Sequence, residues 1–160
     1  MIMKLKDGEV ELELYSDIAP NHVERFKDLS KKGLYDGVVF HRVIDGFMAQ
    51  SGDVKFGNSN SKDFNLALAG TGSSDMPDLK SEFSDIPHDR GVLSAARSAD
   101  PNSANSQFFI CFQPAPHLDR QYTVFGKVIK GMDLIDNIKK GEGPNGSVKS
   151  PDKIISLKLK

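Results

Sequence analysis

Short runs that alternate between apolar and charged residues recur along this chain, whereas helical patterns are rare. Residues 9–14 alternate glutamate with valine or leucine at every position, which is the two-residue period of a strand with one buried face. Asp7-Gly8 is a strong hairpin turn signal, so residues 2–5 are expected to pair with this strand. Further strands are expected over 38–43, 47–51, 92–96, 107–112, 123–129 and 154–159.

Two segments carry a helical pattern instead. The first begins at Pro20, which suits a first helical turn, ends before Gly33, and has an apolar face of Val23, Phe26 and Leu29. The second contains Leu134, Ile135 and Ile138 and is closed by Lys139, Lys140 and Gly141. Two helices are too few for repeated βαβ units, so the pattern predicts a mainly antiparallel β-barrel or sandwich whose ends the helices cover.

Size and charge narrow the classes of function. The 160 residues predict one domain spanning 1–160. Lys and Arg total 21 against 22 Asp and Glu, a net charge of −1, which disfavours nucleic acid or a membrane surface as partner. The single cysteine, Cys111, excludes an internal disulfide and fits a reducing compartment. With no signal-like or spanning apolar run, we expect a cytoplasmic monomer.

Several tempting motifs do not favour the chemistry they suggest. Residues 141–146 match G-x-G-x-x-G but follow a predicted helix, whereas a dinucleotide site needs a strand before the motif and a helix after it. Ser94, His41 and Asp119 lack the G-x-S-x-G elbow of a hydrolase, and the 4 histidines show no metal-ligand spacing. Cys111 lies within an apolar strand and is expected to be a buried small hydrophobe.

Two segments do suggest a site. Residues 107–112 are apolar on both faces, with Gln107, Phe109 and Cys111 on the same one. The pattern leaves open whether another element covers this face or a groove runs along it. Arg42 shares its face with apolar neighbours, so it needs either a paired carboxylate or a site that uses its charge. Residues 55–90 form an unusually long loop, a feature that is often functional, and could shape the rim of a groove or bind a partner.

Three blocks of sequence resemble those of the cyclophilins, which are peptidyl-prolyl cis–trans isomerases. Residues 40–53, FHRVIDGFMAQSGD, resemble the family's F-H-R-x-I-x-x-F-M-x-Q-x-G-D, and residues 105–110, NSQFFI, resemble its N/G-S-Q-F-F-I segment. Leu118-Asp119 followed by VFGKV at 124–128 resembles a third block. The resemblance extends over nearly the whole chain. It implies a closed eight-stranded antiparallel barrel capped by two helices, with proline-containing peptides and unfolded or folding proteins as partners.

The resemblance also implies the roles of individual residues. Arg42 matches the catalytic arginine, which hydrogen-bonds the proline nitrogen in the transition state without a metal or cofactor. Substrate-binding roles are implied for Phe47, Met48, Gln50, Ala96, Arg97, Gln107, Phe109, His117, Leu118 and Tyr122. The alternative that the residues leave open is a binding module that holds proline segments without turnover.

Three of these positions depart from the family pattern. Arg97 replaces an asparagine whose backbone binds the peptide, and Tyr122 stands where the best-known members carry a histidine. His117 stands where many members carry a tryptophan that binds cyclosporin, and this chain has no tryptophan. The resemblance therefore predicts isomerase activity with weakened cyclosporin affinity.

Overall fold

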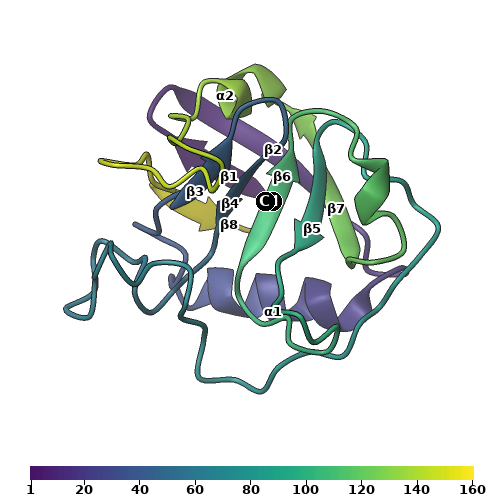
Figure 1. Ribbon diagram of the computed structural model, residues 1–160. Helices are drawn as coiled ribbons and strands as arrows, with labels where there is room; N and C mark the ends of the chain where they lie inside the picture. Colours follow the sequence, from purple (N-terminus) through teal and green to yellow (C-terminus); the bar gives the residue numbers. More distant parts are fainter.

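A computed structural model describes residues 1–160 as one eight-stranded antiparallel sheet with two α-helices (Figure 1). Each predicted strand overlaps an observed one, and 38–43 differs most from its counterpart, β3. The strands are β1 (Ile2–Leu5), β2 (Gly8–Leu14), β3 (Arg42–Ile44), β4 (Met48–Ser51), β5 (Val92–Ala95), β6 (Phe108–Cys111), β7 (Val124–Lys130) and β8 (Ser156–Lys158). The helices are α1 (Pro20–Lys31), α2 (Met132–Asp136) and the 3₁₀ turn η1 (Pro116–Leu118).

Helix α1 forms where the sequence predicts it and closes one end of the sheet (Figure 1). Pro20 occupies its first turn, and Phe26 packs edge-on against Phe108 of β6 with ring centroids 5.2 Å apart. Its N-terminal N–H groups at Asn21 and His22 are capped by the Glu82 carboxylate, because the residue before Pro20 offers no side-chain cap. The long loop therefore anchors this helix.

Helix α2 is shorter than predicted and covers the opposite end (Figure 1). It stops at Asp136, and the chain continues in a tighter turn in which the Ile138 N–H donates to the Ile135 carbonyl over 3.1 Å. Both isoleucines are buried, which confirms the predicted apolar positions, whereas the predicted length of the helix is wrong. No helix has the length and apolar composition needed to cross a membrane.

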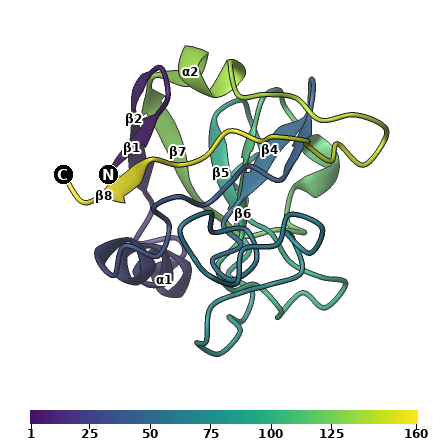
Figure 2. The same cartoon turned by 90° about the vertical axis from the view of Figure 1, so that its left-hand side faces the viewer.

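The expected closed barrel is wrong, because the sheet is a curled half-barrel with two free edges. Its strand order is β3-β4-β6-β5-β7-β2-β1-β8, and the edge strands β3 and β8 do not pair. The segments that precede them exchange irregular bonds instead: the Gly37 N–H donates to Ile154 O (2.7 Å), and the Phe40 N–H donates to Asp152 O (2.8 Å). These bonds form one isolated bridge between Val39 and Lys153 rather than a ladder, which is why 38–43 is mostly not a strand. Figure 2 shows the yellow segment before β8 running across the molecule from the side of β4.

Strand β6 separates two apolar clusters, as its sequence pattern predicts. Phe108 and Ile110 belong to a main core of 24 buried residues. On the other face, Phe109 and Cys111 belong to a cluster of 5 buried residues beneath the surface. Burial raises the pKa of the Cys111 thiol to about 12, so this cysteine is protonated at neutral pH and packs as a small hydrophobe.

Candidate active site

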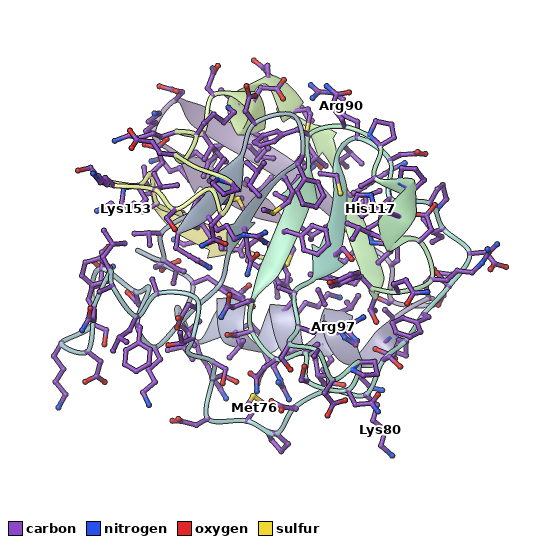
Figure 3. The ribbon with its side chains drawn as sticks, viewed as in Figure 1. Met76, Lys80, Arg90, Arg97, His117 and Lys153 are labelled. Carbon is purple, nitrogen blue, oxygen red and sulfur yellow. The ribbon has the colours of Figure 1, made fainter.

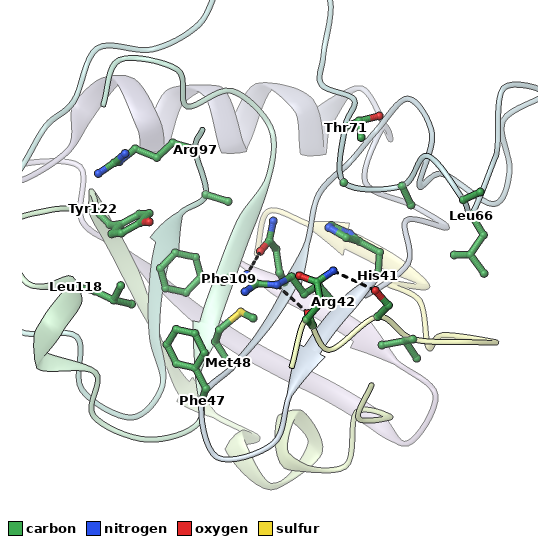
Figure 4. Close-up of a pocket in the computed structure, with 18 residues that line it drawn as sticks. His41, Arg42, Phe47, Met48, Leu66, Thr71, Arg97, Phe109, Leu118 and Tyr122 are labelled. Atoms are coloured by element: carbon green, nitrogen blue, oxygen red, sulfur yellow. Dashed lines mark hydrogen bonds between the residues drawn. The ribbon is translucent and has the colours of Figure 1, made fainter. Parts of the chain in front are cut away.

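A cavity of about 570 Å³ opens on the outer face of β3, β4 and β6, above the smaller apolar cluster (Figure 4). It brings together most of the residues predicted for the site, which are Arg42, Phe47, Met48, Gln50, Ala96, Arg97, Phe109, Leu118 and Tyr122. Gln107 lines an adjoining polar hollow of about 330 Å³. The second face of residues 107–112 is thus the floor of a groove.

One end of the cavity is an apolar slot. Phe109 and Leu118 are buried, and Phe47 is packed against the same cluster. The ring of Tyr122 meets that of Phe109 edge-on, with centroids 5.8 Å apart and planes at 83°. Figure 4 shows these side chains converging on one space. Such walls hold a small apolar ring and exclude water from it.

A chain of polar side chains runs beside the slot. The Arg42 guanidinium donates from Nε to Asn145 O (3.0 Å) and from Nη1 to Gln50 Oε1 (3.2 Å), as dashed lines in Figure 4 mark. Gln50 Nε2 donates to Gln107 Oε1 (3.0 Å), and Gln107 Nε2 donates to Gly70 O (2.9 Å). Arg42 Nη2 makes no hydrogen bond within the protein. The chain therefore fixes the guanidinium while leaving donors for a ligand.

The glycine-rich segment 141–146 holds Arg42 from behind rather than opening a helix. Its Gly146 carbonyl accepts from the Val43 N–H (2.8 Å), beside Arg42 in β3. Gly146 has φ +71°, and a Cβ there would lie 2.5 Å from the Ile44 side chain, so only glycine fits. Asn145 enters the site through its carbonyl, a contact that sequence reasoning missed because any residue type supplies it.

The strand edge after β5 offers unpaired backbone groups. The Ala96 N–H is bonded to Gln107 O (3.0 Å), but the Ala96 carbonyl and the Arg97 N–H have no partner within the protein. The Arg97 guanidinium lies 4.4 Å from the centre of the Tyr122 ring and donates to Gln121 O. Because its side chain is held aside, the backbone at 96–97 is open to an extended peptide.

His117, labelled in Figure 3, does not line the cavity and lies beside Phe47 of the apolar slot. The residue is exposed, and its ring centroid is 5.6 Å from that of Phe47, with the planes tilted by 38°. Of the predicted substrate-binding residues, it is therefore the most peripheral.

A buried hydrogen-bonded chain supports the slot from inside. His88 Nδ1 lies 3.0 Å from Asp119 Oδ1, and His88 Nε2 lies 2.9 Å from Ser94 Oγ. The histidine that joins Ser94 and Asp119 is thus His88 and not His41. Ser94 is 0% exposed, so a substrate cannot reach it and the three residues do not form a hydrolytic site. The His88 ring stacks on Phe109 at 6.1 Å, and Asp119 follows Leu118, so this chain positions two walls of the slot.

His41 and loop residues line the cavity without having been predicted to do so. Desolvation lowers the pKa of His41 to about 4, an effect that Asp53 opposes and Arg42 reinforces. The imidazole is therefore neutral at physiological pH. Leu66, Ala67, Ala69, Gly70 and Thr71 form the far wall of the cavity. The length of the 55–90 loop was the only sequence signal for this wall.

Comparisons with known proteins agree with this geometry. Residues 1–159 match the family described as cyclophilin type peptidyl-prolyl cis-trans isomerase/CLD. A probable peptidyl-prolyl cis-trans isomerase of Brucella suis is 59% identical over 160 residues, which cover 99% of this chain and 81% of the relative. A peptidyl-prolyl cis-trans isomerase of Acinetobacter baylyi is 39% identical over 169 residues, covering 99% of this chain and 84% of the relative.

Solved structures similar to this chain are also cyclophilins. A cyclophilin from Hirschia baltica superposes with a TM-score of 0.80 at 28% identity, covering 97% of this chain and 71% of that one. A Cryptosporidium parvum cyclophilin-type isomerase, crystallised in the presence of the dipeptide Ala-Pro, superposes with a TM-score of 0.78 at 26% identity. That match covers 98% of this chain and 96% of the other.

Proposed function

This chain belongs to the cyclophilin-type peptidyl-prolyl cis–trans isomerases, and we propose that it rotates X–Pro bonds in the described cavity with Arg42 as the catalytic residue. The observation that carries this assignment is the free Nη2 of Arg42, on a guanidinium fixed by Asn145 O and Gln50. It lies beside an apolar slot suited to a proline ring.

Rotation about an X–Pro bond is accelerated by a hydrogen-bond donor at the proline nitrogen. Amide resonance gives the X–Pro bond a barrier of about 18–20 kcal/mol. In the twisted transition state the resonance is lost, and the proline nitrogen regains a lone pair that accepts a hydrogen bond. A donor from Arg42 Nη2 to this nitrogen is strong only in the transition state, which is the condition for raising the rate. No covalent bond forms or breaks.

The remaining residues bind and orient the peptide. Phe47, Met48, Phe109, Leu118 and Tyr122 hold the pyrrolidine ring. The free Ala96 carbonyl and Arg97 N–H pair with the peptide backbone, while Gln50 and Gln107 fix the guanidinium. Guanidinium suits this role better than an ammonium would, because its planar donors are rigid and always charged.

The same site supports a proposal for the substrate class and the cellular role. The presence of Ala-Pro with the Cryptosporidium parvum relative supports the binding of proline peptides by this chain. Unfolded and folding proteins are the proposed clients, since uncatalysed isomerisation takes tens to hundreds of seconds and limits folding. We place this activity in the cytoplasm, in a monomer, with cyclosporin bound weakly because His117 occupies the position of the tryptophan.

Turnover of an X–Pro peptide by Arg42→Ala tests the assignment. Loss of one preorganised transition-state donor is expected to lower kcat/KM by about 100- to 1,000-fold, measured by isomer-specific proteolysis. Arg90→Ala is the matched control, because Arg90 pairs with Asp136 and lies near α2, away from the cavity (Figure 3). Equal turnover by the wild type and Arg42→Ala would make the catalytic assignment wrong. Peptide binding without turnover by the wild type would favour a binding module.

A further inference from the structure

The loop segment that supplies Leu66 to the cavity wall carries three large apolar side chains that are exposed. Phe64 and Leu66 are each 38% exposed, and Leu68 is 42% exposed. They fall within five residues of one another, in a segment with no helix or strand. Clustered exposed apolar side chains mark sites that contact a partner, whereas scattered ones need no explanation.

This segment is held in one conformation by its own bonds. The Phe64 N–H donates to Ser61 O (3.1 Å) and the Leu68 N–H to Asn65 O (3.0 Å). Asn65 also donates its N–H to Phe56 O (2.9 Å) and accepts at Oδ1 from the Ala67 N–H (3.1 Å). The apolar side chains are thus presented outward by an ordered turn, which lowers the entropy lost when a ligand binds them.

Leu66 makes the apolar segment continuous with the catalytic cavity. It lines the same cavity as Arg42 and Phe109. Figure 4 shows Leu66 on one side of Arg42 and the slot of Phe47 and Leu118 on the other. The cavity therefore offers a peptide a second apolar contact, on the other side of Arg42 from the slot.

We propose that Leu66, with Phe64 and Leu68 beside it, is a specificity-determining surface that binds a bulky apolar side chain flanking the X–Pro bond. This inference rests on the proposed function and deepens it. The preferred substrates are then proline segments of unfolded chains, in which apolar residues are accessible. Burying a leucine side chain on this surface raises kcat/KM about tenfold over a serine at the same position.

Paired peptides test the surface directly. Each pair has one Ala-Pro bond and differs only in leucine or serine, placed in turn at each flanking position. Rates are measured by NMR exchange, so no protease preference enters. At one of these positions the wild type is expected to have a kcat/KM about tenfold higher for the leucine peptide than for the serine peptide. This leucine-to-serine ratio is expected to fall below about twofold in Leu66→Ser and in the triple variant Phe64→Ser/Leu66→Ser/Leu68→Ser. Urea unfolding of each variant reports retained folding, and the leucine-to-serine ratio is taken within each protein, so that a general change in rate cancels.

The control is Ile155→Ser, at a residue that is 42% exposed but lines neither cavity, and it is expected to keep the wild-type ratio. A wild-type ratio near one at every position, or an unchanged ratio in Leu66→Ser, overturns the inference while turnover itself upholds the isomerase assignment. No turnover of any peptide by the wild type would instead overturn the proposed function. Concentration-dependent dimerisation that Leu66→Ser abolishes, measured by sedimentation, would assign the surface to a second copy of the chain and overturn the inference.

Discussion

The two walls of the groove are built in different ways. The sheet wall consists of β3, β4 and β6, joined by regular antiparallel pairing. The loop wall contains no helix or strand and depends on one side chain, Asp53, whose carboxylate accepts from four backbone N–H groups. These belong to Lys55 (3.0 Å), Phe56 (2.9 Å), Gly70 (2.8 Å) and Gly72 (2.9 Å).

This difference assigns separate tasks to the two walls. The ladder fixes the backbone at Arg42 and Phe109, as the proposed catalysis requires, because catalysis depends on placement to within a fraction of an ångström. The buried carboxylate of Asp53 ties residues 55–56 to Gly70 and Gly72, so the irregular segment between them is closed at both ends. Gln107 joins the two walls, because its amide donates to the Gly70 and Gly72 carbonyls and accepts from Gln50.

Asp53→Asn is expected to release the loop wall while the sheet wall stays paired. The amide places an NH₂ group against backbone donors, and Asp53 is 0% exposed, so we expect a loss of about 3 kcal/mol in the free energy of unfolding. Urea unfolding measures this loss, and amide hydrogen exchange should rise over residues 54–72 more than in β6. Asp63→Asn, in the exposed part of the same loop, is the control. A stable Asp53→Asn protein with a protected loop would contradict the comparison.

Gln50→Leu is expected to remove the hydrogen bond by which the sheet wall positions the Arg42 guanidinium. Its side chain then no longer accepts from Arg42 Nη1 or donates to Gln107. Since a misplaced catalytic group costs up to about 100-fold in rate, we expect a fall of that order in kcat/KM, with a smaller change in peptide binding. Gln113→Leu, at an exposed position, serves as control. An unaffected rate would mean that Asn145 O alone positions the guanidinium.

His41 lies where the two walls meet, since a Cβ on Gly70 would lie 3.0 Å from its Nε2. Burial lowers the pKa of His41 from 6.5 to about 4, so between these values the unfolded chain binds a proton that the folded chain does not. Stability from this residue is therefore full above pH 6.5 and is lost as the pH falls toward 4. Between pH 6.5 and pH 4 we expect the free energy of unfolding to fall by about 2 kcal/mol because of His41, a figure reduced for the partial exposure of its ring. Urea unfolding of His41→Phe should show a shallower pH dependence than the wild type, and equal slopes would contradict this prediction.

His117→Trp tests the exposed end of the slot and carries the smallest expected effect. An indole beside Phe47 adds aromatic contact area, so cyclosporin is expected to bind about tenfold more tightly. Peptide turnover should change little, because His117 lies outside the cavity. Isothermal titration of both proteins measures this difference. Equally tight binding by the wild type would remove the role assigned to His117.

Sequence patterns predicted the sheet wall better than the loop wall for a physical reason. A strand repeats every two residues, so the two apolar faces of β6 could be read directly, whereas the groove above Phe109 was implied only by the resemblance. The hydrogen bonds of the Asp53 carboxylate and of the Asn145 carbonyl follow no sequence period, because they depend on how backbone groups far apart in the chain meet. The closed barrel that the resemblance implied is not formed, because β3 and β8 do not pair and only the segments before them are bonded to each other.

The central claim is that Arg42 acts on the transition state more than on the bound peptide. NMR exchange on one proline peptide gives both its dissociation constant and its rotation rate on the protein. For Arg42→Ala, the account predicts a rotation rate lowered by about 100- to 1,000-fold and a dissociation constant within about threefold of the wild type. An unchanged rotation rate, or an equal loss in binding and in rate, would contradict it.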